Sequence, residues 1–140
     1  MTPQDACNCM ALRRAARRIS NFYDGELAPS GLRATQFAIL TLLQRAGETS
    51  VNALAERLAL DRTTAGKNLR PLEQAGFIAV APSRQDGRRR VVRLTIAGAS
   101  ILKIATPLWR RAQGMFETAN GGAKTAALRQ TLSALQFGQG

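Results

Sequence analysis

The chain has 140 residues and a formal net charge of +11 at pH 7, with 20 Lys and Arg against nine Asp and Glu. A hydrophobic share of 45% predicts a folded domain, and the positive charge favours a polyanionic partner such as nucleic acid. There is no histidine, which excludes Cys/His zinc sites, Ser-His-Asp triads and Cys-His pairs.

The hydropathy pattern gives no sign of a membrane protein. No apolar run approaches the roughly 18 residues of a spanning helix, and residues 1–10 lack the basic start and apolar centre of a signal peptide. The two cysteines, Cys7 and Cys9, provide no disulfide framework. No residue pattern predicts a catalytic centre, a metal site or a cofactor. We therefore expect a cytoplasmic protein that does not bind membranes and is not an enzyme.

Apolar residues that recur every three or four positions predict four helices in the first half of the chain. The first carries four arginines between its apolar residues and is broken by Pro29-Ser30-Gly31. Thr35 is expected to cap the second helix, which ends at Gly47. The first helix is expected over 8–27, the third over 50–60 and the fourth over 61–75.

A β-hairpin is predicted next, with apolar strands on either side of Ser83–Arg90. This segment contains Asp86-Gly87, a strong turn signal. A long helix then opens at Thr95, and a last helix follows the turn Asn120-Gly121-Gly122. Pro71 and Pro107 fall inside predicted helices, so we expect a bend near the first and a kink or break at the second.

This order predicts a mainly α fold with a small β-hairpin, a winged helix-turn-helix of six helices. Two short helices joined by a tight turn and followed by a basic hairpin have this layout. Within a single unit over 1–140, we expect 33–98 to form the DNA-binding lobe. Helices 8–28 and 99–138 should pair between two copies, because their leucines have no partner in a compact lobe. Such a homodimer predicts recognition helices ~34 Å apart and a pseudo-palindromic duplex site.

Two groups of polar residues have the chemistry that binds double-stranded DNA. In this fold the helix over 61–75 is the recognition helix, which presents donors to base edges and phosphates of DNA. The tip of the hairpin is the wing, whose arginines reach the phosphate backbone or the minor groove. Asp86 is expected to pair with an arginine and hold the shape of the wing. Either group alone can also be a solvated charged surface. The recognition-helix residues are Arg62, Thr63, Thr64, Lys67, Asn68 and Arg70, and the wing residues are Arg84, Asp86, Arg88, Arg89 and Arg90.

The sequence resembles the MarR family over about residues 9–137. The resemblance implies a dimeric winged-helix transcription regulator, usually a repressor, in which Arg88 enters the minor groove and Asp86 organises the wing. Lys67 and Pro71 depart from the family pattern, which leaves the preferred DNA sequence open. The residues that carry the resemblance are Thr63-Thr64, Leu69, Leu72-Glu73, Gly76-Phe77-Ile78, Asp86-Gly87-Arg88, Leu94-Thr95 and Gly98.

The resemblance also implies a signal that controls the regulator, and one form of it is a small aromatic or phenolic ligand. A pocket for this ligand is expected between the dimer helices and the DNA-binding lobe. Tyr23, Phe22 and Trp109 can line it, with Arg17 or Arg18 binding a carboxylate. These aromatic residues can instead belong to the core, and the arginines can be solvated.

Oxidation of a thiol is the other form of signal. Cys9 and Tyr23 have the fourteen-residue spacing of the organic-peroxide-sensing branch of the family, with Arg13 one turn beyond Cys9. That branch usually has a second tyrosine where Arg13 stands. The alternative is that Cys9 is a small apolar residue of a dimer helix, as free cysteines often are.

Three other functions remain open at this stage. The chain can be an architectural DNA-binding protein without an effector, recognisable by sequence-independent binding with a steep salt dependence. As an alternative to the expected absence of a membrane partner, the arginine-rich first helix can bind an anionic membrane surface or an acidic protein. The sequence names neither the target genes nor the direction of regulation.

Overall fold

The computed structural model describes residues 1–138 and follows the predicted order of helices, hairpin and helices. The described residues add a four-residue helix, a three-residue 3-10 helix and a two-residue strand that the sequence did not predict. The helices are α1 (Pro3–Ala6), α2 (Asn8–Leu27), the 3-10 helix η1 (Ala28–Ser30), α3 (Ala34–Ala46), α4 (Val51–Arg57), α5 (Arg62–Gln74), α6 (Ile96–Asn120) and α7 (Gly122–Ser133), and the strands are β1 (Thr49–Ser50), β2 (Ile78–Pro82) and β3 (Arg90–Leu94).

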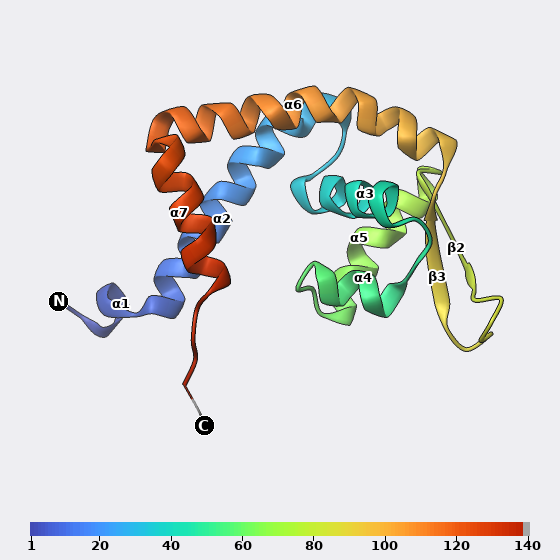
Figure 1. The fold of residues 1–140 in the computed structure, drawn as a ribbon, viewed down its shortest axis with the longest axis horizontal. Helices are drawn as coiled ribbons and strands as arrows, with labels where there is room; N and C mark the ends of the chain where they lie inside the picture. Colours follow the sequence, from blue (N-terminus) through green and yellow to red (C-terminus); the bar gives the residue numbers. More distant parts are fainter. Residues whose placement is uncertain (139–140) are drawn as a thin grey trace.

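Helix α6 crosses the molecule and connects its two parts (Figure 1). It starts beside the sheet and turns at Gly121 into α7. Helices α2 and α3 both pack against α6. Within residues 1–138, no helix combines the length and the apolar character needed to cross a membrane.

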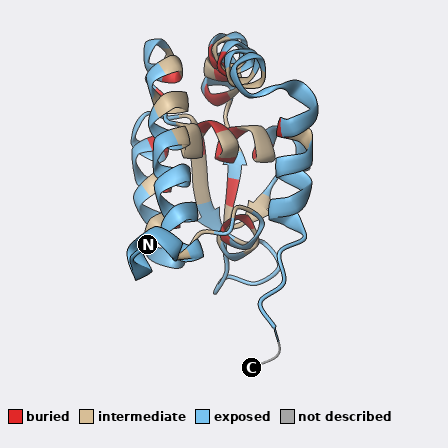
Figure 2. Ribbon diagram, turned by 90° about the vertical axis from the view of Figure 1, so that its left-hand side faces the viewer, coloured by how far each residue is buried: buried red, intermediate tan, exposed pale blue. Residues whose placement is uncertain are grey.

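The hydrophobic core lies mainly in the lobe formed by α3, α4, α5 and the sheet, and Leu27 of α2 and Leu102 and Ala105 of α6 complete it. In contrast, Leu27 is the one buried residue of α2 and Thr125 that of α7. The helices at the two sides of Figure 2 are accordingly mostly exposed. The core is thus concentrated in one part of the molecule, and its largest fully buried side chains are Leu27, Ile39, Leu40, Leu43, Leu54, Leu72 and Val92.

The sheet has three antiparallel strands in the order β1-β3-β2. The predicted hairpin is present as β2 and β3, with Val80 opposite Val92. The prediction of a two-stranded sheet was incomplete, because Thr49 also pairs with Val92 from the other side. A two-residue strand has too few residues to show an alternating pattern. The lobe is a winged helix-turn-helix, and the predicted fold class is confirmed.

Three predicted helix starts have the expected caps. Ser50 accepts the Ala53 N–H at 3.1 Å, and Asp61 and Thr95 cap α5 and α6 in the same way. The prediction that Thr35 caps α3 was wrong, since Thr35 lies inside the helix and Arg33 precedes it. The first free N–H of α3, on Ala34, instead donates to the Asp24 carboxylate at 2.7 Å.

The prolines do not interrupt their helices, so the break considered at Pro107 does not occur. Each proline removes one backbone hydrogen bond, and α6 buries Leu102 and Ala105 before Pro107 and Ala112 after it. Packing on both sides therefore keeps the helix continuous. The last helix ends earlier than predicted, at Ser133, and α1 was missed because four residues carry no periodic signal.

Candidate nucleic-acid interface

Helices α4 and α5 form the helix-turn-helix, and the turn between them is tight. Ala59 adopts a left-handed conformation with φ of 53°, and the N–H of Leu60 donates to the carbonyl of Ala55 at 2.8 Å. The chain then extends into Asp61, which begins the next helix. This turn fixes the direction in which α5 leaves α4.

The start of α5 is fixed by its cap. The Asp61 carboxylate accepts the backbone N–H of Thr64 at 2.7 Å, and this hydrogen bond holds the pKa of Asp61 below its usual value. Ala65, Leu69 and Leu72 form the buried face of the helix. Their spacing of three and four residues leaves the opposite face free for a ligand.

The predicted recognition residues divide into exposed and engaged side chains. Thr64 and Asn68 are half-buried, and the Asn68 amide donates to the Thr64 carbonyl at 2.9 Å. Asn68 must give up this hydrogen bond to pair with adenine through both its amide atoms. The remaining four residues, Arg62, Thr63, Lys67 and Arg70, are exposed.

Asp86 organises the wing as expected. Its carboxylate accepts the Arg88 N–H at 3.1 Å, and its carbonyl accepts the Arg89 N–H at 3.0 Å. The same carboxylate lies 3.9 Å from Arg89 Nε in an exposed ion pair. Asp86 therefore pairs with Arg89 and leaves the guanidinium of Arg88 without an ion-pair partner among the described residues.

A groove of about 510 Å³ separates the wing from α4 and α5. Four arginines line it, and Arg62 also donates to Asn52 Oδ1 at 3.3 Å. The sequence analysis missed Asn52, which lies in the first turn of α4 and carries no charge. The groove does not include Lys67, Asn68, Arg70 or Arg84. We call it the arginine groove, and its residues are Ser50, Val51, Asn52, Ala53, Glu56, Arg62, Gly66, Arg88, Arg89 and Arg90.

A second pocket, of about 810 Å³, lies where α2, α3, α4 and α6 meet. Tyr23 and Trp109 line it, as the sequence suggested, whereas Phe22, Arg17 and Arg18 do not. The last two are exposed on α2. We call it the aromatic pocket, and its residues are Tyr23, Ala34, Phe37, Ala38, Thr41, Leu42, Arg45, Ala46, Arg57 and Trp109.

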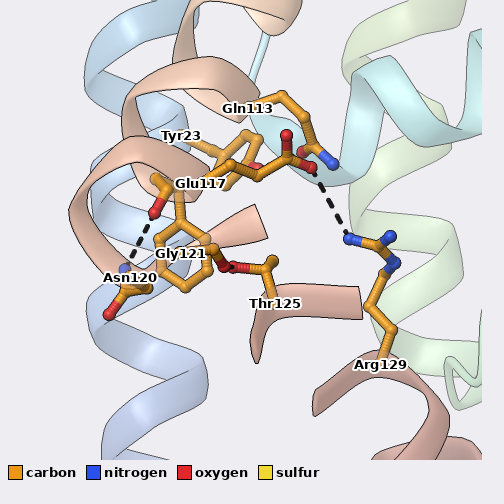
Figure 3. Close-up of polar contacts among 8 residues, drawn as sticks. Tyr23, Gln113, Glu117, Asn120, Gly121, Thr125 and Arg129 are labelled. Carbon is orange, nitrogen blue, oxygen red and sulfur yellow. Dashed lines mark hydrogen bonds and ion pairs between the residues drawn. The ribbon is translucent and has the colours of Figure 1, made fainter. Parts of the chain in front are cut away.

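Tyr23 also belongs to a polar cluster that joins α2, α6 and α7 (Figure 3). Its hydroxyl donates to Gln113 Oε1, and burial, reinforced by the negative charge of Glu117, raises the pKa of Tyr23. Glu117 forms an ion pair with Arg129 of α7 at 3.8 Å. Tyr23 of α2 therefore lines the aromatic pocket and is also hydrogen-bonded to α6 through Gln113.

Known proteins resemble both the lobe and the whole chain. A model of the MarR family matches residues 32–89. The HTH-type transcriptional repressor NicR of Pseudomonas putida is 26% identical over 130 residues, which are 91% of this chain and 82% of NicR. The crystal structure of the M. tuberculosis transcriptional regulator MosR is 33% identical, with a TM-score of 0.76, and the match covers 94% of this chain and 99% of MosR. The chain belongs to the MarR family.

Two of the similar solved structures are complexes with DNA. MosR has also been solved with DNA. The transcriptional repressor CouR, bound to a 23-mer DNA duplex, is 26% identical, with a TM-score of 0.82 over 95% of this chain and 94% of CouR. Family membership confirms that this chain is a DNA-binding transcription regulator and not an enzyme.

The structure places both cysteines at the start of α2, far from Tyr23 of the same chain. Cys7 is half-buried at the start of α2, and Cys9 and Arg13 are exposed. Cys9 and Tyr23 lie fourteen residues apart on one continuous helix, which separates them by ~21 Å along the axis. A contact between Cys9 and Tyr23 therefore requires the tyrosine of a second copy.

Proposed function

We propose that this MarR-family chain is a cytoplasmic repressor that binds a pseudo-palindromic DNA duplex as a homodimer. The observation that carries the proposal is the arginine groove, which three arginines of the wing line together with Arg62 and Gly66 of the recognition helix. Arg62, Arg88 and Arg90 have no ion-pair partner among residues 1–138. Phosphates are the natural counter-charges for such a groove.

Each DNA-binding element has its own role in this proposal. Arg88, held by the Asp86 turn, enters the minor groove, and the other wing arginines, including Arg84, bind phosphates. On α5, Arg62, Thr63 and Lys67 contact base edges and phosphates in the major groove, with Arg70 on the phosphate backbone. Thr64 and Asn68 contribute less to this contact with the major groove of DNA, since both are half-buried.

Pairing of residues 8–28 and 99–138 between two copies explains the exposed leucines of the terminal helices. Leu12 of α2 and Leu128 and Leu132 of α7 are 43–47% exposed in the isolated chain. A two-fold interface over these helices buries them and positions two recognition helices on one face of DNA. The proposed dimer therefore supplies both the missing burial and the symmetry of the site.

The proposed effector is a small aromatic molecule in the aromatic pocket, which lies between the terminal helices and the lobe. Its wall includes Trp109 stacked on Phe37, with ring centroids 5.9 Å apart. Oxidation of Cys9 is the alternative signal, supported by the exposure of its thiol. Loss of DNA binding on peroxide treatment that Cys9→Ser prevents would favour the thiol.

The experiment that tests the function is selection of bound sequences from a random duplex pool at near-physiological salt. Enrichment of a pseudo-palindrome with half-sites about one turn apart is the expected result. Binding without an enriched motif would make the chain an architectural protein. Absence of binding would contradict the proposal and turn attention to anionic membranes and protein partners.

A further inference from the structure

Four arginines lie on one face of the first half of α2. Residues three, four or seven positions apart share a face of an α-helix, so Leu12, Ile19 and Tyr23 lie together on one side. The four arginines lie on roughly the opposite side, and all of them are exposed. We call this surface the arginine face, and its residues are Arg13, Arg14, Arg17 and Arg18.

The arginine face points away from α6. Tyr23, on the opposite side of α2, donates its hydroxyl to Gln113 of α6, and this contact fixes how α2 is turned about its axis. In Figure 1, α6 lies on one side of the molecule, whereas the start of α2, α4 and the loop between β2 and β3 extend to the other side. The arginine face is therefore on the same side of the molecule as the helix-turn-helix and the tip of the wing.

No ion pair in the described part of the chain neutralises the arginine face. The acidic residues of α2 are engaged elsewhere. Asp24 accepts the backbone N–H that begins α3 at 2.7 Å, and Glu26 pairs with Arg111 at 3.8 Å. Asp5, before the helix, is hydrogen-bonded to Thr2 at the start of α1. The positive charge of this surface is thus available to a partner.

The arrangement lowers the stability of the free helix. Arg13 and Arg17 are four residues apart, as are Arg14 and Arg18, and like charges at this spacing repel one another. Phosphates remove the repulsion, and a guanidinium can bind a phosphate through two parallel N–H groups. A duplex also gains entropy from the counterions that it releases. DNA is therefore the polyanion that suits both this surface and the neighbouring arginine groove.

We infer that the arginine face of α2 binds DNA phosphates between the two half-sites of the duplex, in addition to the contacts of the arginine groove. The inference rests on the proposed function, because it adds a contact surface to the proposed dimer on DNA. Helices α2 and α7 carry the proposed two-fold interface, so the start of α2 lies near the axis and over the centre of the site. The two recognition helices then flank this contact.

The test removes pairs of charges from α2 and measures the salt dependence of DNA binding. Fluorescence anisotropy gives the affinity of the full chain for its selected duplex at several salt concentrations. Each phosphate contact adds about 0.9 to the slope of log K against log salt. Arg13→Gln combined with Arg17→Gln should lower this slope by about 2 to 4 and weaken binding at least about 10-fold. Arg14→Gln combined with Arg18→Gln should do the same, and glutamine keeps the helix propensity of arginine.

Lys103→Gln combined with Arg110→Gln is the matched control. Both side chains are exposed on α6, and neither forms an ion pair within the described residues. This variant loses the same charge from the side of the molecule opposite the wing tip, so the affinity and the slope should hardly change. Equal effects in the control and in the α2 variants would overturn the inference, because they would reflect net charge and not contact. Wild-type binding by both α2 variants would overturn it as well.

A chemically modified duplex locates the contact. Replacing the phosphates between the half-sites by neutral methylphosphonates should weaken binding of the wild type and affect the α2 variants much less, since the two changes remove the same contact. Equal losses in the wild type and the variants would overturn the inference. An α2 variant that dissociates in analytical ultracentrifugation would place the arginine face in the dimer interface and would also overturn it.

Vesicles of phosphatidylserine and phosphatidylcholine in equal parts test the other polyanionic surface. If the α2 variants lost binding to these vesicles but bound DNA like the wild type, the arginine face would belong to a membrane contact, and the inference would be wrong. We expect the reverse, with the main loss in DNA binding.

Failure of this inference and failure of the proposed function give different results. A chain that selects a pseudo-palindrome, with α2 variants that bind it like the wild type, keeps the function and loses the inference. A chain that selects no motif loses the function. In that case a lower salt slope of the α2 variants on a random-sequence duplex would keep phosphate binding by the arginine face but overturn its place between two half-sites.

Discussion

The DNA-binding lobe and the terminal helices differ in how much of their apolar surface the chain itself covers. In the lobe, Leu40, Leu54 and Val92 are completely buried. On the terminal helices, Leu128 and Leu132 remain more than two-fifths exposed. Burial of a leucine side chain is worth about 2 kcal/mol, so the lobe holds most of the stability that a single chain provides.

This difference indicates which part of the molecule can act alone. The lobe has a closed core and presents its polar face to DNA, whereas α2 and α7 are complete only when another apolar surface covers them. The long helix α6 belongs to both parts, since it packs against α2 and α3. Changes in the terminal helices should therefore alter assembly first, and changes in the lobe should alter folding first.

The largest expected effect comes from placing a charge on the terminal helices. Leu132→Glu puts a carboxylate into the proposed apolar interface, where an unpaired charge costs several kcal/mol, and two-fold symmetry places it there twice. We expect the dimer to dissociate at micromolar concentration in analytical ultracentrifugation, with the helical circular dichroism spectrum retained. The control is Gln130→Glu, on the opposite face of α7. If the Leu132→Glu variant remained a dimer, the interface would have to lie elsewhere.

Removing core volume from the lobe should have the next largest effect. Leu40→Ala leaves a cavity at a position with 0% exposure, and such substitutions cost about 2 to 5 kcal/mol. Urea unfolding measures the loss, and DNA binding should weaken with it. Ile96→Ala is the matched control, because this side chain is 90% exposed and its loss should cost less than about 0.5 kcal/mol. Equal losses would mean that the lobe does not hold the core.

Much of the lobe could be predicted from the sequence, because its signals are local. Ala65, Leu69 and Leu72 repeat at the helical period, and Ser50, Asp61 and Thr95 are cap residues directly before their helices. The Asp86-Gly87 turn marked the wing in the same way. Each of these features depends on residues within about two helical turns of one another along the chain.

The features that the sequence did not predict depend on residues far apart along the chain. The cap of α3 comes from Asp24, ten residues earlier. The cations of the aromatic pocket are Arg45 and Arg57 rather than Arg17 and Arg18, since helix packing decides which arginines face it. The arginines of α2 share their helix with Tyr23, which made them look adjacent to the pocket.

Gly98, in the first turn of α6, lies in close contact with the rest of the lobe. An added Cβ at Gly98 would lie 2.6 Å from Leu94 Cδ1 and closer still to the Phe77 carbonyl oxygen. Gly98→Ala should therefore lower the free energy of unfolding by about 1 to 3 kcal/mol. Gly114→Ala in the same helix is the matched control, since it meets nothing within 4 Å and should stabilise the helix by about 0.5 to 1 kcal/mol. A tolerated Gly98→Ala would show that the start of α6 can shift away from Phe77 and Leu94.

A substitution in the wing tests the polar face of the lobe, and its expected effect on the free energy of DNA binding is smaller. Arg88→Ala removes a guanidinium from the arginine groove and should weaken binding to most DNA sites by about 1 to 2 kcal/mol, with a shallower salt dependence. Fluorescence anisotropy at several salt concentrations measures both. Arg84→Ala, exposed on the wing outside the groove, should have a smaller effect. Unchanged affinity for Arg88→Ala would remove it from the proposed interface.

The smallest expected effect lies in the turn of the helix-turn-helix. Ala59 has a left-handed conformation with φ of 53°, which costs a residue with a Cβ about 1 to 2 kcal/mol. Ala59→Gly removes this strain, and the greater freedom of unfolded glycine offsets part of the gain. We expect a net stabilisation of about 0.5 to 1 kcal/mol in urea unfolding. Ala15→Gly, inside the exposed part of α2, should instead destabilise by about 1 kcal/mol.

The direction in which Ala59→Gly changes the free energy of unfolding shows what keeps the turn of the helix-turn-helix in place. A gain in stability would mean that the well-packed core around α4 and α5 keeps the turn in place against local strain. A loss as large as that of Ala15→Gly would mean that the Ala59 methyl group makes contacts that outweigh the strain. In that case the turn itself, and not only the core of the lobe, fixes the direction of the recognition helix.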